Sequence, residues 1–82
     1  MTTEIAALKS LGNPGELWQH HKGGLYRIVE VVFEESSGRA GIAYRSLETK
    51  TVWWRPLDDF MALVKRPSGP AIPRFVFVPE TE

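Results

Sequence analysis

Apolar and polar residues alternate along most of this chain, and a period of two residues is typical of β-strands with one buried face. Clusters of glycine, proline, serine and asparagine separate the alternating segments and mark turns. The expected strands are residues 17–21, 25–34, 39–47, 51–55 and 72–78. About five short strands joined by tight turns predict a mainly β protein with a small, strongly bent sheet.

Alternation also predicts which side chains of the longest strand lie in the core. One face of this strand carries Arg27, Val29, Val31 and Phe33, whereas the opposite face includes Glu30. The first set is the more apolar of the two. It is therefore the expected core face.

A helical period interrupts the alternation after Pro56, which has no N–H to donate to a sheet and suits the first turn of a helix. Apolar residues then recur at helical spacing, which predicts a short amphipathic helix over residues 57–64. They are Leu57, Phe60, Met61 and Val64. A second helix is expected over residues 3–11, with Thr3 as its cap and Gly12 as its stop. It is too short to be stable alone, so it must pack on the sheet or on a second copy of the chain.

A chain of 82 residues supports one domain with one modest core. Within this single domain, residues 1–82, we expect an N-terminal helix in residues 1–12 and an acidic tail at residues 79–82. Residues 15–78 are expected to form a small SH3-like or OB-like half-open barrel. There is no cysteine, which excludes disulfides and a thiolate zinc site. No signal peptide and no apolar run of ~20 residues is present, so we expect a cytoplasmic protein that does not enter a membrane.

The overall charge gives no reason to expect binding to polyanions, because ten basic and ten acidic residues cancel. Any site for an anion must therefore be local. In the segment that precedes the central helix, Trp53 and Arg55 share one face of the expected strand, and Trp54 takes the other. Tryptophan and arginine are enriched at binding hot spots, so Trp53 and Arg55 are candidate ligand contacts.

Four basic side chains could surround an anionic group: His20, Lys22, Arg45 and Arg55. Arginine can hold a phosphate with two parallel hydrogen bonds. His20 and Lys22 share a side of their expected strand, whereas His21 should point the other way. Because adjacent strand histidines cannot face one metal ion, no metal and no cofactor is expected.

Aromatic residues could add flat surfaces on which a nucleobase stacks. The candidates are Trp18, Tyr26, Tyr44 and Trp53, and of these Tyr44 and Trp53 are the favoured stacking residues. An enzyme is not expected. Ser36 and Ser37 lack a nucleophile-elbow sequence, and Asp58 and Asp59 match the carboxylates that favour the start of a helix.

Several motifs follow one another in a fixed order. They are Trp18-Gln19-His20-His21-Lys22-Gly23, Tyr26, Ala43-Tyr44-Arg45, Trp53-Trp54-Arg55-Pro56-Leu57 with Phe60, and Pro73-Arg74-Phe75. In order and spacing they resemble the bacterial and phage domain-of-unknown-function family numbered 1653, over about residues 15–78. The resemblance implies a small β-barrel, and its closing Arg-Phe motif adds Arg74 to the candidate ligand-binding residues. The family's usual His-Ser/Thr-Glu-Thr-Gly loop differs here, where residues 34–38 read Glu-Glu-Ser-Ser-Gly.

The favoured function is a non-catalytic binding module for a nucleotide or a short nucleic acid. The phage side of the resemblance suggests a small viral protein that sequesters a host nucleotide signal, as a homo-oligomer joined through the N-terminal helix. The alternative is a protein-interaction domain with a host protein as its partner. Its aromatic groove would use Trp18, Trp54 and the proline-rich loop at residues 65–70.

Overall fold

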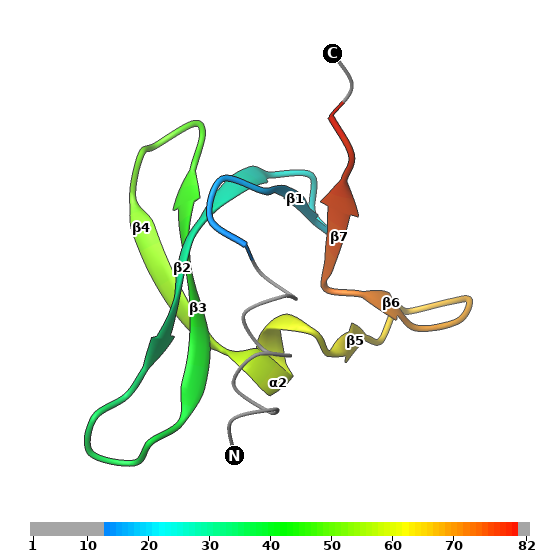
Figure 1. Cartoon of the computed structure of the whole chain (residues 1–82). Helices are drawn as coiled ribbons and strands as arrows, with labels where there is room; N and C mark the ends of the chain where they lie inside the picture. The colour runs from blue at the N-terminus through cyan, green and yellow to red at the C-terminus, as the bar shows by residue number, and fades with distance from the viewer. Residues whose placement is uncertain (1–12, 81–82) are drawn as a thin grey trace.

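The structure, a computed structural model, describes residues 13–80 and is mainly β (Figure 1). Its elements are β1 (Leu17–His20), β2 (Leu25–Phe33), β3 (Ala40–Ser46), β4 (Val52–Pro56), α2 (Leu57–Phe60), β5 (Leu63–Val64), β6 (Ile72–Pro73) and β7 (Phe75–Val78). Five strands form a curved antiparallel sheet in the order β4-β3-β2-β1-β7, and β5 pairs with β6 separately. The mainly β class is confirmed, and β4 and β7 remain the two edges of an open sheet. The helix predicted over residues 3–11 lies outside the described residues.

The core face of β2 changes at a β-bulge between Ile28 and Glu30. Before the bulge, Tyr26 and Ile28 pack on the core, and after it Val31 does so. Of the predicted core set only Val31 is buried, whereas Val29 and Phe33 are 38% and 39% exposed, so that prediction is wrong for most of the strand. One extra residue in one strand of a pair moves the following side chains to the other face, and alternation alone does not reveal it.

The helix after Pro56 has a single turn, since α2 ends at Phe60 and the chain then enters β5. Val64 pairs with Ile72 of β6. The prediction of a helix through Val64 is therefore wrong at its C-terminal end, whereas Leu57 and Phe60 do pack on the core. No helix in the described part of the chain has the length and hydropathy needed to cross a membrane.

The last predicted strand is divided at Arg74, because β6 pairs with β5 and β7 pairs with β1. The backbone of Arg74 is held on both sides of this corner. Its N–H donates to the carbonyl of Ala62 at 2.9 Å, and its carbonyl accepts from the N–H of His21 at 2.8 Å. Pro73 lies in the two-stranded sheet, where each strand has a free edge, as its missing N–H predicts.

Aromatic rings dominate the core, which joins α2 and β7 to the inner face of the sheet. Its buried members are Trp18, Ile28, Val31, Ile42, Tyr44, Phe60 and Phe75. Phe60 stacks on Phe75 with ring centroids 4.1 Å apart and planes 5° from parallel. Trp18 and Tyr44 meet Phe60 edge to face, at 5.4 Å and 5.6 Å. These contacts place α2 next to Arg74, which precedes β7.

On the opposite face of the sheet, the indole of Trp54 covers Gly41. A Cβ atom at Gly41 would overlap Cε2, Cζ2 and Nε1 of that indole. The indole Nε1 also donates to the carbonyl of Val32 at 3.2 Å. Glycine is therefore required at position 41 for a close approach and not for an unusual backbone angle.

Candidate functional site

Side chains from opposite ends of the sheet meet at one carboxylate. Arg55 of β4 donates from Nη1 to Oδ2 of Asp59 in α2 at 2.9 Å. Arg74, at the corner before β7, donates from Nε to the backbone carbonyl of Asp59 at 3.0 Å, and its Nη2 lies 3.8 Å from Oδ1. We refer to Arg55, Asp59 and Arg74 as the arginine bridge. The bridge links β4 to the corner before β7 by side-chain contacts. The edge strands β4 and β7 themselves do not pair, so the sheet stays open.

Aromatic rings hold the arginine bridge from the core side. Tyr44 Oη accepts a hydrogen bond from Nε of Arg55 at 3.2 Å. The guanidinium carbon of Arg55 also lies 6.0 Å from the ring centroid of Phe75. The hydrogen bond to Tyr44, followed by the contact with Asp59, raises the pKa of Arg55 above its ordinary value. The side chains of Arg55 and Arg74 are 28% and 24% exposed, so both cations are held in place and still reach solvent.

His20 lies at the margin of this cluster, with its ring centroid 4.9 Å from that of Phe75. Its Nδ1 accepts a hydrogen bond from the N–H of Lys22 at 3.2 Å, so the proton of the neutral ring is on Nε2. Burial lowers the pKa of His20 below its ordinary value of 6.5, and so do the charges of neighbouring groups. Those groups are His21, Arg55, Arg74 and Lys22, in that order. His20 and the guanidinium group of Arg55 both lie against the ring of Phe75, so His20 borders the arginine bridge.

Replacing His20 with asparagine should reduce the acid sensitivity of the fold. Because the pKa of His20 is lower in the folded protein than in the unfolded chain, the unfolded chain binds more protons as the pH falls through 6.5 and below. The free energy of unfolding must then decrease on acidification through this range, and His20 contributes no such change at higher pH. The Oδ1 atom of asparagine still offers an acceptor to the N–H of Lys22.

The measurement is urea unfolding of both proteins at about pH 7.5 and about pH 5.5. We expect a smaller loss of stability in the His20→Asn variant. An equal loss in the two proteins would show that His20 does not carry this pH dependence.

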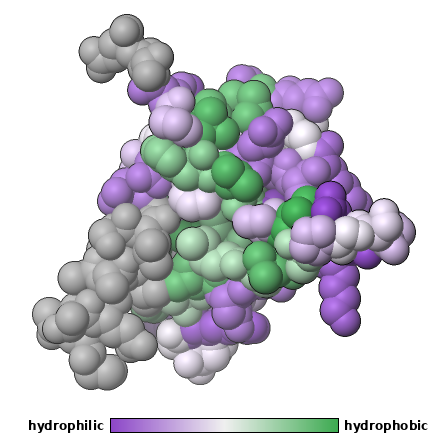
Figure 2. Space-filling model, turned by 90° about the vertical axis from the view of Figure 1, so that its right-hand side faces the viewer, coloured by the Kyte–Doolittle hydropathy of each residue, from purple (hydrophilic) through white to green (hydrophobic). Residues whose placement is uncertain are grey.

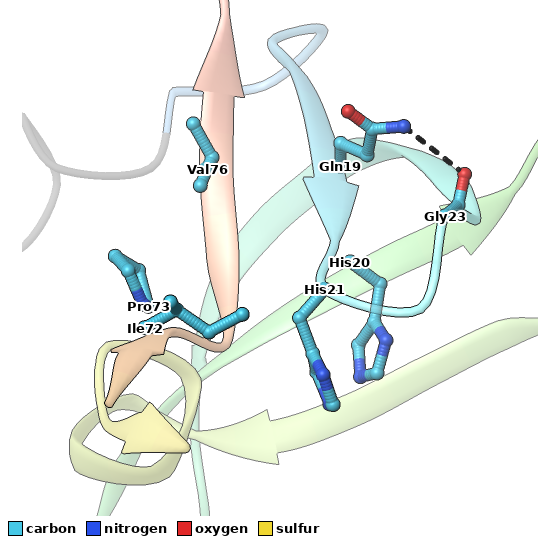
Figure 3. A pocket seen from close by; sticks show the side chains of 7 residues that line it. All are labelled: Gln19, His20, His21, Gly23, Ile72, Pro73 and Val76. Carbon is cyan, nitrogen blue, oxygen red and sulfur yellow. Dashed lines mark hydrogen bonds between the residues drawn. The ribbon is translucent and has the colours of Figure 1, made fainter. Parts of the chain in front are cut away.

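A shallow pocket of about 400 Å³ adjoins His20 (Figure 3). It is lined by Gln19, His20, His21, Gly23, Ile72, Pro73 and Val76. The imidazoles of His20 and His21 lie side by side, with centroids 4.3 Å apart, while Gln19 turns toward the backbone of the following turn. The predicted opposite orientation of His21 is therefore wrong. Strand β1 ends at His20, and the alternation of a strand does not apply to the turn that follows.

The pocket opens on a face with a mixed surface. Figure 2 shows apolar patches on this side of the molecule, interrupted by hydrophilic side chains. Exposed apolar residues of the nearby elements include Leu63 and the pocket-lining Val76, which are 64% and 51% exposed. Apolar surface next to a cluster of cations suits a ligand that has both an anionic group and a flat or apolar part.

The structure brings together His20, Arg55 and Arg74, because His20 and Arg55 both contact Phe75 and the two arginines meet at Asp59. The charge of Lys22 is the smallest of the contributions that lower the pKa of His20. Arg45 lies on the opposite face of the sheet. In the β3–β4 pair, Arg55 stands opposite Ile42, and Arg45 is three residues beyond Ile42. Because faces alternate along a strand, an odd separation places Arg45 away from Arg55. The expectation that these two arginines share one patch is therefore wrong.

The candidate stacking residues differ in exposure. Trp53 stands opposite Tyr44, so it shares the face of Arg55, and it is 54% exposed. Tyr44 is only 5% exposed, because rings including Tyr26 and Phe75 enclose it. Tyr44 thus orients Arg55 and offers no open face to a ligand. Trp53 remains the aromatic residue placed to stack.

Asp59 is a member of the site that the sequence does not predict, because a carboxylate in the first turn of a helix already has a local explanation. A spacing of four residues predicts a contact only within one helix, and Arg55 lies in β4. Among residues 13–80, no group of three or more histidine, cysteine, aspartate or glutamate side chains is placed to hold a metal ion. The described cluster is instead rich in charge-assisted hydrogen-bond donors.

Comparison with known proteins gives one match. No curated protein and no solved structure matches the chain. A family model described as "Protein of unknown function (DUF1653)" matches residues 16–77, which include the whole arginine bridge together with His20 and His21. The match covers more than half of the chain and agrees with the motifs seen in the sequence. The chain therefore belongs to the DUF1653 family.

Proposed function

We propose that this protein is a non-catalytic binding module for a phosphorylated ligand, either a nucleotide or a short nucleic acid. The observation that supports this function best is the arginine bridge, which holds Arg55 and Arg74 together at Asp59 beside the ring of Phe75 that His20 also contacts. In the described cluster, Asp59 is the carboxylate that contacts both arginines. An excess of positive charge in a half-buried position attracts an anionic group more strongly than exposed cations do.

In this proposal the guanidinium groups hold the phosphate, and the exposed ring of Trp53 stacks on a base. Such stacking contributes about 1–3 kcal/mol per base in single-stranded recognition. The pocket beside His20 gives room for another part of the ligand. A bent sheet of the SH3-like or OB-like kind suits this use, since OB-folds bind oligonucleotides on the face of their strands. A module that binds a nucleotide without converting it would also suit a protein that sequesters a nucleotide signal.

Thermal unfolding in the presence of a ligand panel tests the proposal. The panel contains nucleoside mono-, di- and triphosphates, cyclic nucleotides, and short DNA and RNA oligomers. A ligand at 100 times its dissociation constant stabilises the fold by about 2.7 kcal/mol, which raises the melting temperature measurably. We expect at least one member to do so, with an effect that weakens at high salt. Unchanged melting temperatures across the whole panel at millimolar concentration would contradict the proposal.

A second candidate function is a protein-interaction domain, and the outer face of the sheet favours it. Trp54 and Val32 are 38% and 39% exposed there, and with Glu34 they line a hollow of about 260 Å³. Trp18 cannot contribute to an aromatic groove, because it is 9% exposed and belongs to the core. A host protein that binds the wild type but not a Trp54→Ala variant, with no response to the nucleotide panel, would favour this second function.

A further inference from the structure

The arginine bridge already contains an anion, at the place where the proposed function puts a phosphate. One carboxylate oxygen of Asp59 lies 2.9 Å from Arg55 Nη1, and the other lies 3.8 Å from Arg74 Nη2. Carboxylate and phosphate oxygens accept the same hydrogen bonds from a guanidinium group. The second distance exceeds the ~3.2 Å of an ordinary N–H···O hydrogen bond. The carboxylate therefore satisfies Arg55 well and Arg74 poorly.

Neither arginine depends on this carboxylate alone for its position. Nε of Arg55 donates to Tyr44 Oη, and Nε of Arg74 donates to the backbone carbonyl of Asp59. Both bonds persist if the Asp59 side chain rotates away. That side chain is 47% exposed, so the carboxylate can turn into water without unfolding α2. The two guanidinium groups would then stay in place with their Nη atoms available to another anion.

We propose that Asp59 is an internal competitor, which a ligand phosphate must displace to reach Arg55 and Arg74. This inference rests on the proposed function and adds to it a residue that sets how tightly the site binds anions. Displacing the carboxylate is the same step for every anion, so it lowers the affinity of all anionic ligands by a common factor. A bare anion cannot recover that loss. A nucleotide recovers it through further contacts, such as stacking on Trp53. The competitor therefore leaves the ratio of the two affinities unchanged, and it makes the further contacts of a nucleotide necessary for tight binding.

The test compares Asp59→Asn with Asp58→Asn, a matched control. Asp58 lies on the same helical turn, but its side chain is 78% exposed and contacts Arg39 at 3.5 Å. Both variants lose one negative charge. Isothermal titration with inorganic phosphate and with adenosine 5′-monophosphate should show a gain of about tenfold or more for Asp59→Asn, by the same factor for both probes. The gain for Asp58→Asn should stay below about twofold.

A second measurement uses the wild-type protein, so it does not depend on how a variant folds. The ¹³Cγ signal of Asp59 should move as adenosine 5′-monophosphate is added, whereas that of Asp58 should not. Three results would overturn the competitor role. The two variants could gain affinity equally, or Asp59→Asn could bind phosphate no more tightly than the wild type. The third is a ¹³Cγ signal of Asp59 that does not shift at saturation. Failure of every nucleotide to bind either the wild type or Asp59→Asn is a different result, and it would overturn the proposed function itself.

Discussion

Replacing Arg55 with alanine will weaken nucleotide binding by about 100-fold, whereas replacing Arg45 with alanine will change it by less than about twofold. Hydrogen bonds to charged groups contribute about 1.5–3 kcal/mol each, and the change in Arg55→Ala also removes a half-buried positive charge. Arg55 lies in the arginine bridge, beside Tyr44 and Phe75. Arg45 lies on the opposite face of the sheet, three pairs away along the same two strands.

The Arg45→Ala variant is a matched control, because both changes remove one arginine from the β3–β4 pair and alter the net charge equally. Affinity is measured by titration with the nucleotide that gives the largest thermal shift. Circular dichroism of each variant is recorded at the same temperature, since Arg55 also holds Tyr44 and Asp59. Similar losses in the two folded variants would mean that general electrostatic attraction governs binding. Unchanged affinity in Arg55→Ala would remove this residue from the site.

Replacing Phe60 with alanine will lower the free energy of unfolding by about 3–5 kcal/mol. Phe60 is 1% exposed and packs on Phe75, Trp18 and Tyr44. Its removal leaves a cavity among rings that support each other, and α2 is too short to move in and fill it. Domains of this size have only about 5–10 kcal/mol in total, so the variant should be close to unfolding at room temperature.

Phe33→Ala provides the comparison, because Phe33 is 39% exposed at the end of β2. We expect a loss of about 1 kcal/mol or less for that change. Urea unfolding monitored by circular dichroism gives both values. If Phe60→Ala costs no more than Phe33→Ala, then the stacked rings are not the centre of the core, and α2 is held by other contacts.

The sequence predicts the elements of this fold better than their details. Alternation and turn residues locate β1 to β4, and the proline at position 56 marks the change from strand to helix. The bulge after Ile28 does not follow from local pattern, because it is fixed by pairing with β3. The end of the helix is missed for a similar reason. Val64 fits a helical stripe, but pairing with Ile72 places it in a strand.

The candidate site could be predicted in part. Trp53 and Arg55 share a face, as alternation requires, and His20 and Arg74 join them through pairing between β1 and β7. Arg45 was misplaced because the register between β3 and β4 cannot be read from one strand. Asp59 was missed because a carboxylate in the first turn of a helix already has a satisfactory local explanation. Contacts between distant segments decide both cases.

The arginine bridge has a consequence for how this protein can evolve. The same three side chains link β4 to the corner before β7 and belong to the proposed ligand site. Selection for a new ligand and selection for an intact fold therefore act on the same three residue positions. Lineages that alter these positions should also acquire compensating substitutions in the aromatic core, so that changes in recognition and changes in packing arise together.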